Sequence, residues 1–558
     1  MSAVKAQDVG PGKEVSLTHL VVASSIGTLF EWYDLIVFGA LAPVIAEHFF
    51  TPLGKSLGLV FALLLFGIAY LARPIGAAVF GHIGDVKGRK VAFVMTVALM
   101  GVATFIIGLV PSYGTIGIAA PLIITVLRFA QGISLGGEYG GAVTYLAEHA
   151  PAGRRGLITS WLQTTGPMGL LMGLLVILAT RLTVGEDAFK EWGWRIPFLI
   201  SIFLLAISVW LRIKLAESPV FKKMQDEGRT SKRPLSEIFG NWSKLKIVLL
   251  GVFGFTSGLG VIWYTTLLYT LLFMTQSLGV SPTRATILVS IAIALGMPLF
   301  VVAGAISDKI GRKKLIFTGL ALSTLMLFPV FMAITHYANP QLEKALANFP
   351  VTVEASPGQC HFQLDVSKTK KFVSSCDIVR SYIVKSGINY SFEALSPDSS
   401  VVRVKVGQEV LTLAAKIGAQ DGQGNGYAGS EVKDFLQKVT ASLQNAGYPD
   451  KSTTPETNDV MIVLLVLFLV ALLSMSYGPT AAMLSEMFAA RTRYSEMSLA
   501  YHIGTGWFGG FLPSVAFALV VATGNIYAGL WYPVAVTLVT VLLGGKFLKE
   551  TLHRDIEE

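Results

Sequence analysis

The sequence predicts an all-α membrane protein in which twelve spans form two six-helix bundles and a small α+β domain interrupts the second bundle. Three observations support this fold class. The 558 residues are 53% hydrophobic and only 14% charged, whereas soluble domains carry about 25% charged residues. One ten-residue motif occurs in both halves of the chain, and a single long polar stretch, 337–458, separates otherwise apolar segments.

Long apolar stretches account for the low charge. A helix needs about 20 apolar residues to cross a bilayer core, and the chain contains twelve such stretches. The strands of a membrane barrel would instead alternate apolar and polar residues over about ten positions, so a barrel is excluded. The expected spans are 18–46, 56–80, 91–111, 116–148, 157–182, 194–213, 246–277, 284–306, 313–336, 459–486, 497–522 and 526–548.

Basic residues cluster in the short loops that follow every second span, and this pattern explains the formal net charge of +9. The clusters lie at 87–90, 154–155, 309–314 and 491–493. Because Lys and Arg mark cytoplasmic loops, both ends of the chain are expected on the cytoplasmic side of the membrane. No recognition motif supports a nucleic-acid partner, and residues 1–16 lack a signal-peptide cleavage pattern.

An internal duplication organises the chain. The segment Gly-His-Ile-Gly-Asp-Val-Lys-Gly-Arg-Lys at 81–90 recurs as Gly-Ala-Ile-Ser-Asp-Lys-Ile-Gly-Arg-Lys at 304–313, a displacement of 223 residues. A second repeat, displaced by 338 residues, pairs Tyr139, Gly140, Glu148 and Arg155 with Tyr477, Gly478, Glu486 and Arg493. The two displacements differ by 115 residues, which measures the length of an insertion in the second half. Two parallel six-span repeats are the arrangement of the major facilitator fold.

The insertion follows the ninth span, which places it on the extracytoplasmic side. Strand-like runs at 351–354 and 401–406 and helical runs at 374–385 and 431–445 indicate a small α+β domain. The expected parts of the chain are a cytoplasmic tail 1–16, an N-terminal bundle 17–214, a cytoplasmic linker 215–244, the first three C-terminal helices 245–336, the insertion 337–458, the last three helices 459–549 and a tail 550–558.

Both cysteines of the chain, Cys360 and Cys376, lie in this insertion. Two cysteines confined to one external domain predict a periplasmic disulfide. Two free buried thiols are the alternative. A zinc site that also uses His361 would lack a fourth ligand.

Seven motifs follow one another along the chain. They are Glu-Trp-Tyr-Asp at 31–34, Ala-Arg-Pro-Ile-Gly at 72–76, the loop 81–90, Arg-Phe-Ala-Gln-Gly at 128–132, Gly-Gly-Glu-Tyr-Gly-Gly at 136–141, Ala-Glu-His-Ala-Pro at 147–151 and Glu-Ser-Pro-Val-Phe at 217–221. Taken in this order, they resemble the metabolite:H⁺ symporter family of the major facilitator superfamily. That resemblance implies proton-coupled transport across a bacterial inner membrane by alternating access, without a cofactor, of substrates such as α-ketoglutarate, citrate, shikimate, proline or betaine.

Charges inside the expected spans need a partner or water, because a charge at bilayer depth costs several kcal/mol. Asp34 and Arg128 have similar expected depths, and we expect them to face each other. Protonation of Asp34 would then free Arg128 to hold a substrate carboxylate; a permanent salt bridge is the alternative. Glu31 and Glu138 are further candidates for proton coupling, with hydrogen bonding or helix packing as their alternatives.

The remaining candidates fall into two groups. Arg73, Tyr33, Gln163, Trp263 and Tyr264 are candidate substrate-binding residues, although Trp and Tyr also form ordinary interfacial belts. His502 could titrate near neutral pH, although a lone His is more often a packing residue. The repeated loops are expected to act as a conformational latch, in which Asp accepts hydrogen bonds from Arg or from a helix N-terminus. The latch residues are Gly81, Asp85, Gly88, Arg89, Lys90, Asp308, Gly311 and Arg312.

The sequence therefore favours a monomeric transporter that moves a small organic acid together with protons. Uptake of a zwitterion such as betaine or proline is the alternative. A receptor that binds ligand through the insertion is an alternative of another class. The sequence contains no nucleophile–base pair, P-loop or metal cluster, so an enzyme is not expected.

Overall fold

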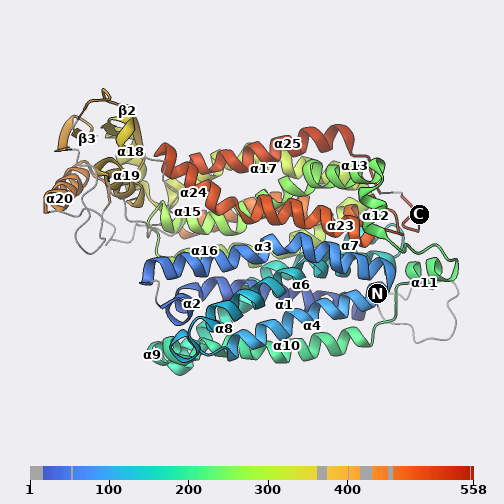
Figure 1. The fold of residues 1–558 in the computed structure, drawn as a ribbon. Coiled ribbons are helices and arrows are strands. Elements are labelled where there is room, and N and C mark those ends of the chain that lie inside the picture. The colour runs from blue at the N-terminus through green and yellow to red at the C-terminus, as the bar shows by residue number, and fades with distance from the viewer. Residues whose placement is uncertain are drawn as a thin grey trace.

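Long helices run side by side in two groups, and a separate small domain lies at one end of them (Figure 1). The linker helices α11 (Pro219–Asp226) and α12 (Pro234–Phe239) lie at the opposite end. The insertion and the linker therefore lie on opposite sides of the helical body. The computed structural model describes residues 17–51, 54–360, 374–386, 388–399, 401–414, 430–449, 457–552 and 554–557.

The N-terminal bundle contains the first six expected spans. Each expected span corresponds to a long helix or to two consecutive helices, with a break near Leu41 in the first span and near Thr164 in the fifth. Their bounds are α1 Leu17–Ala40, α2 Ala42–Phe49, α3 Gly54–Val86, α4 Arg89–Leu109, α5 Tyr113–Ile116, α6 Ala119–His149, α7 Arg155–Gln163, α8 Thr165–Val184, α9 Glu186–Ala188, η2 Phe189–Gly193 and α10 Arg195–Ile213.

The C-terminal bundle contains the other six. Three π-helical turns interrupt its seventh and eleventh spans, at η3, η4 and η6. The bounds are α13 Trp242–Gly251, η3 Val252–Thr256, α14 Ser257–Tyr264, η4 Thr265–Tyr269, α15 Thr270–Gln276, α16 Pro282–Ile310, α17 Arg312–Ala338, α21 Asp459–Tyr477, α22 Thr480–Met487, α23 Arg493–Tyr501, η6 His502–Gly509, α24 Leu512–Thr523, η7 Ala528–Leu530 and α25 Trp531–Phe547.

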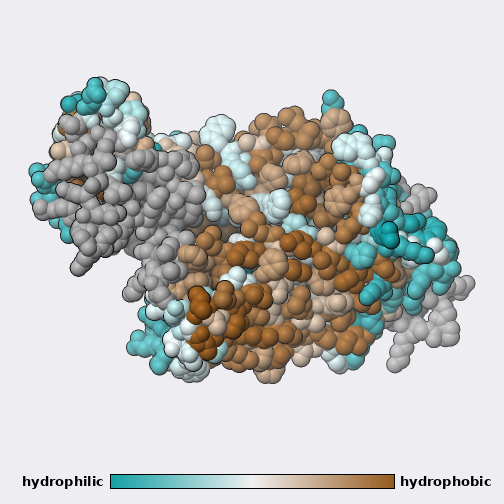
Figure 2. Space-filling model, viewed as in Figure 1, coloured by the Kyte–Doolittle hydropathy of each residue, from teal (hydrophilic) through white to brown (hydrophobic). Residues whose placement is uncertain are grey.

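The helices are long and apolar enough for a membrane protein. Among the described residues, eleven helical stretches meet the length and hydropathy needed to cross a bilayer. Helix α3, 33 residues long, occupies the place of the second expected span and completes the twelve. On the face shown in Figure 2, hydrophobic side chains cover the middle of the helical body and hydrophilic side chains gather toward its ends. The predicted fold class is confirmed.

Glycines allow the helices of the N-terminal bundle to approach closely. A Cβ on Gly136 of α6 would overlap the carbonyl of Arg73 on α3, and a Cβ on Gly132 would lie 2.5 Å from the carbonyl oxygen of Ala69. The interpretation of the glycines at 136–141 as helix contacts is confirmed. Gly140 and Gly141 contact the second half of the chain, since a Cβ there would meet Ser498 and Tyr494.

The insertion is an α+β domain with one four-stranded sheet in the order β2-β1-β3-β4. β1 pairs parallel with β2 and antiparallel with β3, which pairs antiparallel with β4. The expected strands and helices at 351–354, 401–406, 374–385 and 431–445 are present, whereas β2, β4 and α18 were not predicted. The elements are α18 Pro340–Asn348, β1 Val351–Ala355, η5 Pro357–Gln359, α19 Ser375–Lys385, β2 Tyr390–Ala394, β3 Val401–Val406, β4 Glu409–Ala414 and α20 Ser430–Asn445.

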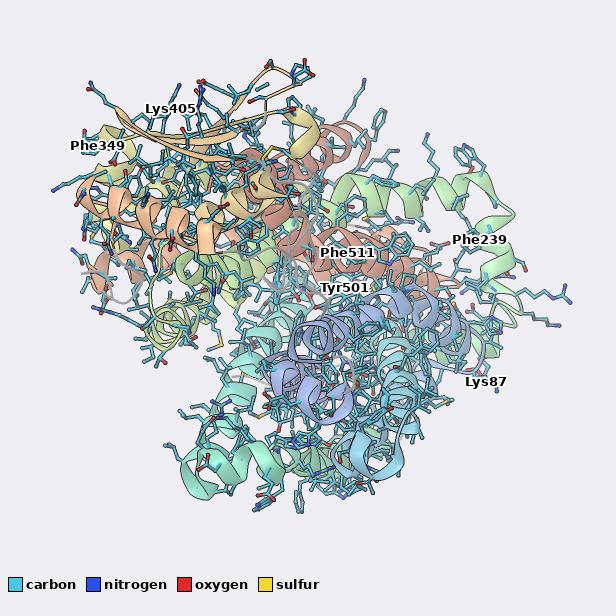
Figure 3. The ribbon with its side chains drawn as sticks, turned by 60° about the vertical axis from the view of Figure 1, so that its left-hand side comes forward. Lys87, Phe239, Phe349, Lys405, Tyr501 and Phe511 are labelled. Carbon is cyan, nitrogen blue, oxygen red and sulfur yellow. A yellow bond between two sulfur atoms is a disulfide. The ribbon has the colours of Figure 1, made fainter. Side chains whose placement is uncertain are left out.

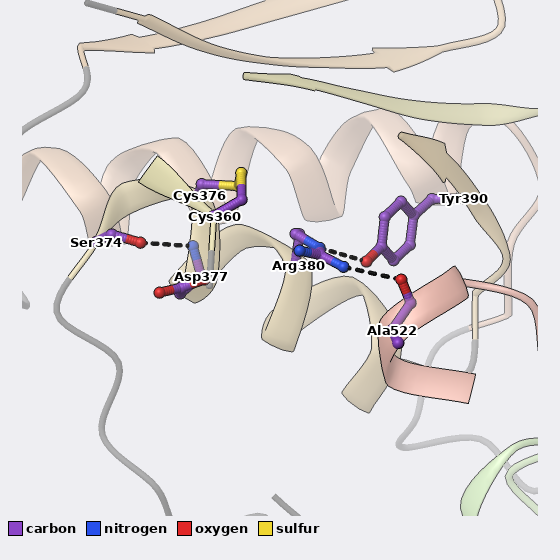
Figure 4. The surroundings of a disulfide bond; sticks show 7 residues. All are labelled: Cys360, Ser374, Cys376, Asp377, Arg380, Tyr390 and Ala522. Atoms are coloured by element: carbon purple, nitrogen blue, oxygen red, sulfur yellow. Dashed lines mark hydrogen bonds between the residues drawn. A yellow bond between two sulfur atoms is a disulfide. The ribbon is translucent and has the colours of Figure 1, made fainter. Parts of the chain in front are cut away.

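The predicted disulfide between Cys360 and Cys376 is present and holds the start of α19 (Figure 4). His361, the residue considered for a zinc site, lies outside the described residues. Helix α19 then docks on the end of α24, where Arg380 donates a hydrogen bond to the carbonyl of Ala522 at 3.0 Å and another to the Tyr390 hydroxyl (Figure 4). The insertion is thus anchored to the C-terminal bundle.

Candidate functional site

A cavity lies where the two bundles meet, near Tyr501, which sits between them in Figure 3. Helices α1, α3 and α6 of the first half and α14, α21, α23 and η6 of the second half contribute to its wall. Its volume is about 20 Å³, which accommodates water but not an amino acid unless side chains move. The lining residues are Glu31, Trp32, Arg73, Tyr139, Leu259, Gly260, Trp263, Tyr264, Tyr477, Tyr501 and Thr505.

Two charged residues line this cavity, and both come from the N-terminal bundle. Arg73 is 3% exposed, and its Nε and Nη2 atoms have no hydrogen-bond partner among the described residues. The guanidinium lies over the Tyr70 ring at 4.4 Å from the ring centroid. Glu31 is 5% exposed, and its Oε2 atom also has no partner in the described part of the chain. Buried charged groups are normally paired, so both are available to a bound solute.

Aromatic side chains form most of the remaining wall and connect the two bundles. Trp32 stacks on Trp263 with ring centroids 4.7 Å apart. Tyr139 stacks on Tyr501 at 3.7 Å, with ring planes 12° apart. The Tyr264 hydroxyl donates a hydrogen bond of 2.9 Å to the hydroxyl of Tyr70. A solute can occupy the cavity only by separating these contacts.

Asp34 and Arg128 are in contact, but they do not line the cavity. The Nη1 of Arg128 lies 3.3 Å from the Asp34 carboxylate, and both side chains are fully buried in the N-terminal bundle. Gln131 joins the pair, since its Oε1 accepts from Arg128 at 2.7 Å and its Nε2 donates to Asp34 at 2.9 Å. Arg128 is therefore held by Asp34 and Gln131 in this conformation, as either hypothesis for the pair requires.

Three other predicted site residues also lie outside the cavity wall. The Tyr33 hydroxyl donates to the carbonyl of Pro197 at 2.7 Å, inside the N-terminal bundle. Glu138 pairs with the Arg212 guanidinium and accepts from Thr96, so it serves as a buried ion pair between helices. Gln163 contacts the cavity indirectly, because its Nε2 donates to the Tyr139 hydroxyl at 2.9 Å. The predicted residues Arg73, Glu31, Trp263 and Tyr264 do line the cavity.

The repeated loops lie together at the end of the bundles that carries the linker. Asp85 pairs with Arg89 at 2.7 Å and accepts hydrogen bonds from the backbone N–H groups of Tyr494 and Ser495 at the start of α23. Arg89 also lies 3.4 Å from Glu148, which pairs with Arg493 at 2.8 Å. The first loop thus binds a helix N-terminus of the opposite half through hydrogen bonds.

The second loop makes the same contacts with the halves exchanged. Asp308 pairs with Arg312 at 2.7 Å and accepts from the backbone N–H groups of Gly156 and Leu157 at the start of α7. Glu486 lies 3.3 Å from Arg312 and 3.8 Å from Arg155. We name the residues of these two networks the latch. Their contacts hold the two bundles together at this end.

Two latch glycines have backbone conformations that favour glycine. Gly88 has φ +117° and Gly311 has φ +106°, and each immediately precedes a helix. At the first loop, Gly81 lies so close to α23 that a Cβ would approach the Ser495 Cα at 2.6 Å. Lys90 was also predicted for the latch, but its Nζ donates to the carbonyl of Ile213 at 2.7 Å, a bond within the N-terminal half that does not join the bundles.

A further pair of carboxylates completes the latch and was not predicted. Glu217 accepts from the backbone N–H of Lys90, and Glu550 accepts from the backbone N–H of Lys313. The hydroxyls of Ser218 and Thr551 donate to Glu148 and Glu486 respectively. A signal for these residues exists in the sequence, since Leu-Ala-Glu-Ser at 215–218 recurs as Leu-Lys-Glu-Thr at 548–551.

The linker is attached to the same end through Glu237 of α12. The Glu237 carboxylate accepts hydrogen bonds from Ser231 at 2.6 Å and from Arg491 at 2.9 Å, and Lys244 lies 3.3 Å away. Partial burial opposes ionisation of this carboxyl group, but the three hydrogen bonds outweigh it and lower the pKa of Glu237. These contacts tie the linker to the second half.

Family models match most of the chain. The model described as "Sugar (and other) transporter" matches residues 20–246 and 439–558, leaving most of the insertion unmatched. A second model, "MFS/sugar transport protein", matches residues 144–356. Among solved structures, the proton:xylose symporter XylE bound to 6-bromo-6-deoxy-D-glucose shares the fold, with a TM-score of 0.60 over 97% of this chain and 98% of that chain at 16% identity.

Three curated relatives illustrate the sequence similarity. A proline/betaine transporter of Salmonella typhimurium is 35% identical over 57% of this chain and 65% of its own length. The inner membrane metabolite transport protein YhjE of Escherichia coli is 37% identical over 54% of this chain and 68% of its own length. The shikimate transporter of Escherichia coli is 32% identical over 56% and 72%. The matched region thus spans about two thirds of these relatives.

The sequence matches and the fold agree. The transporter model covers more than half of the chain, and relatives above 30% identity are covered over more than two thirds of their length. The two helical bundles and the two repeated loops are in accord with these matches. The chain therefore belongs to the sugar and metabolite transporter family of the major facilitator superfamily.

Proposed function

We propose that the chain is a proton-coupled symporter that takes up a small zwitterion of the betaine or proline type across the bacterial inner membrane. One observation carries this proposal. The cavity between the bundles contains one buried cation, Arg73, and one buried carboxyl group, Glu31, and the Nε and Nη2 of Arg73 and the Oε2 of Glu31 have no hydrogen-bond partner among the described residues. A solute that carries both a carboxylate and an ammonium group complements these two charges.

The relatives support the zwitterion more than the organic acid that the sequence favoured. The transporter of Salmonella typhimurium with 35% identity is named for proline and betaine. A transporter of Dickeya dadantii with 35% identity is named for glycine betaine, proline, ectoine and pipecolic acid. Arg73 alone would also hold a simple carboxylate, and the similarity to a shikimate transporter keeps that solute class as the second candidate.

The latch supports alternating access as the mechanism. Its contacts close one end of the structure, because Glu148–Arg493 and Glu486–Arg155 join the two halves. Opening that end requires these bonds to break, and bonds at the other end must then form. We assign the closed end to the cytoplasm because the basic loops lie there. The cavity and the latch form within one chain, so a monomer is sufficient.

In this proposal Asp34 is the group that binds the transported proton. Its ion pair with Arg128 is fully buried, and protonation of Asp34 removes one partner and changes the contacts that α1 makes with α6. In this scheme Arg73 holds the solute carboxylate, while Arg128 responds to the proton. Glu31 then contacts the ammonium end of the solute.

Uptake by purified protein in proteoliposomes tests the proposal. An imposed inside-alkaline pH gradient should drive accumulation of labelled betaine or proline, and a protonophore should abolish it. Uptake of labelled shikimate and α-ketoglutarate under the same gradient tests the second candidate, transport of a simple carboxylate. Transport of the carboxylates without the zwitterions would refute the proposed solute, and absence of any gradient-driven uptake would refute symport and leave a receptor.

A further inference from the structure

We infer that the cavity is an aromatic cage that recognises a methylated ammonium group, so the preferred solutes are N-methylated amino acids rather than amino acids with a free ammonium group. This inference rests on the proposed function and specifies its substrate class. The cage is defined by the rings of Trp32, Tyr139, Trp263, Tyr264, Tyr477 and Tyr501, which make up six of the eleven lining residues.

The rings come from both bundles and surround the same small space. Trp263 is central among them, with ring centroids 4.7 Å from Trp32, 4.9 Å from Tyr264 and 6.4 Å from Tyr477. A cation is attracted to the face of an aromatic ring, most strongly to Trp, and the attraction grows when water is excluded. All six rings are at most 9% exposed, so a cation that separates the stacked pairs and enters between them would lose its water and contact several rings.

Apart from the Oε2 of Glu31, free hydrogen-bond acceptors are scarce in this wall. The hydroxyls of Tyr264 and Tyr139 already bond to Tyr70 and Gln163. The hydroxyls of Tyr477 and Tyr501 bond to each other at 3.3 Å. A primary ammonium group brings three N–H donors that all need acceptors, and burying unpaired donors is costly. A trimethylammonium group brings none.

The donors without partners suit the other end of the solute. The Nε and Nη2 of Arg73 and the Nε1 of Trp263 are buried and lack hydrogen-bond partners among the described residues. A carboxylate is acceptor-only when ionised and satisfies such donors. Glu31 supplies the single carboxylate of the cavity wall and compensates the solute cation. The wall thus provides rings and one negative charge for the cation, and N–H donors for the carboxylate.

Competition in proteoliposomes tests this inference. Exchange of labelled glycine betaine should be inhibited by glycine, N-methylglycine, N,N-dimethylglycine and glycine betaine with affinity rising at each methyl group, by roughly 100-fold over the series. The isostere 3,3-dimethylbutanoate has the shape of betaine without its positive charge, and should bind at least tenfold more weakly. A flat series, or an isostere that competes as well as betaine, would overturn the cage while proline uptake would still support the proposed function. If no zwitterion is exchanged, both proposals fail.

A pair of variants separates the cage from a general packing effect. Trp263→Leu should lower the affinity for glycine betaine about tenfold and bring its ratio to 3,3-dimethylbutanoate close to one, while Trp263→Phe should keep most of the ratio. Loss of packing alone would weaken both ligands equally and leave the ratio unchanged, which would contradict the cage. Trp161→Leu is the matched control, because that side chain is 49% exposed and lies outside the cavity wall.

Discussion

The latch and the central cavity both lie between the two halves of the chain, yet the halves contribute to them in opposite ways. In the latch the ion pairs and the contacts with a helix start in one half have counterparts in the other, since Asp85 binds the start of α23 and Asp308 binds the start of α7. In the cavity the N-terminal half supplies both charges, whereas the C-terminal half supplies Trp263, Tyr264, Tyr477 and Tyr501. The duplication is preserved at one site and lost at the other.

The difference reflects what each site does in our proposal. Opening and closing separates two similar bodies about one axis, so equivalent contacts on both sides are sufficient. A dipolar solute has two unlike ends, and a symmetrical wall would not distinguish them. Charged positions of the first half accordingly have uncharged counterparts in the second. At the displacements of 223 and 338 residues, Arg73, Arg128 and Glu138 correspond to Gly296, Val466 and Ser476.

Among the variants, removal of the positive charge of Arg73 from the cavity should have the largest effect on uptake. Arg73→Met should lower zwitterion uptake at least about 100-fold, because hydrogen bonds to a charged group are worth roughly 1.5–3 kcal/mol each and two are lost. Arg73→Lys should recover part of the activity as a single point charge. Uptake kinetics in proteoliposomes provide the measurement, and wild-type kinetics in Arg73→Met would exclude Arg73 as the carboxylate anchor.

Asp34→Asn distinguishes proton coupling from a structural salt bridge. If Asp34 carries the proton, the variant should lose accumulation against a gradient while solute exchange across the membrane continues. If the pair with Arg128 only locks two helices, removal of one partner should destabilise the bundle by about 3–5 kcal/mol, and accumulation and exchange should fall together with the thermal unfolding temperature. Parallel assays of accumulation, exchange and unfolding separate the two cases.

Because the two halves contribute equivalent contacts to the latch, equivalent substitutions in the two halves should have equal effects on uptake. Asp85→Asn and Asp308→Asn should each weaken charge-assisted hydrogen bonds to a helix N-terminus and reduce uptake about tenfold, within roughly threefold of each other. Ser160→Cys reports opening, because Ser160 is fully buried near Gly304 at this end and the two native cysteines form a disulfide. Its labelling rate should rise similarly in both variants. A strong effect from one position alone would show that the halves are not equivalent.

The sequence predicted the helices and the latch loops better than the cavity. Apolar length is sufficient to locate a span, and the ten-residue repeat located both loops. The lining residues were predicted only in part, because a helix that is apolar on all sides does not show which face borders the cavity. By sequence Tyr33 is therefore as suitable as Tyr264, although in the structure its hydroxyl bonds to Pro197 inside one bundle. In the insertion, the two missed strands β2 and β4 are the sheet edges, where patterning is weakest.

The insertion has no counterpart in the first half. Destabilising it therefore tests whether transport depends on a part of the chain that only one half contains. Replacing both Cys360 and Cys376 by Ser should destabilise this domain by about 3 kcal/mol, because the disulfide closes a loop with a sequence separation of 16. Proteolysis within 337–458 should become faster. Uptake should stay within about twofold of wild type, since the cavity and latch residues all lie outside the domain, and a large loss of uptake would assign the insertion a part in transport.

Substitution of the equivalent residues Lys90 and Lys313 should have the smallest effects on stability and uptake. The Nζ of Lys90 donates to the carbonyl of Ile213 at the end of α10, and the Nζ of Lys313 donates to the carbonyl of Gly545 near the end of α25. Each cation also interacts favourably with the negative end of its helix, so Lys90→Ala and Lys313→Ala should each cost at most about 1 kcal/mol. Because both bonds lie within one half and do not join the bundles, uptake should change less than threefold in either variant. Ser160→Cys labelling should stay at the wild-type rate, and faster labelling in one of them would mean that this peripheral contact also holds the latch closed.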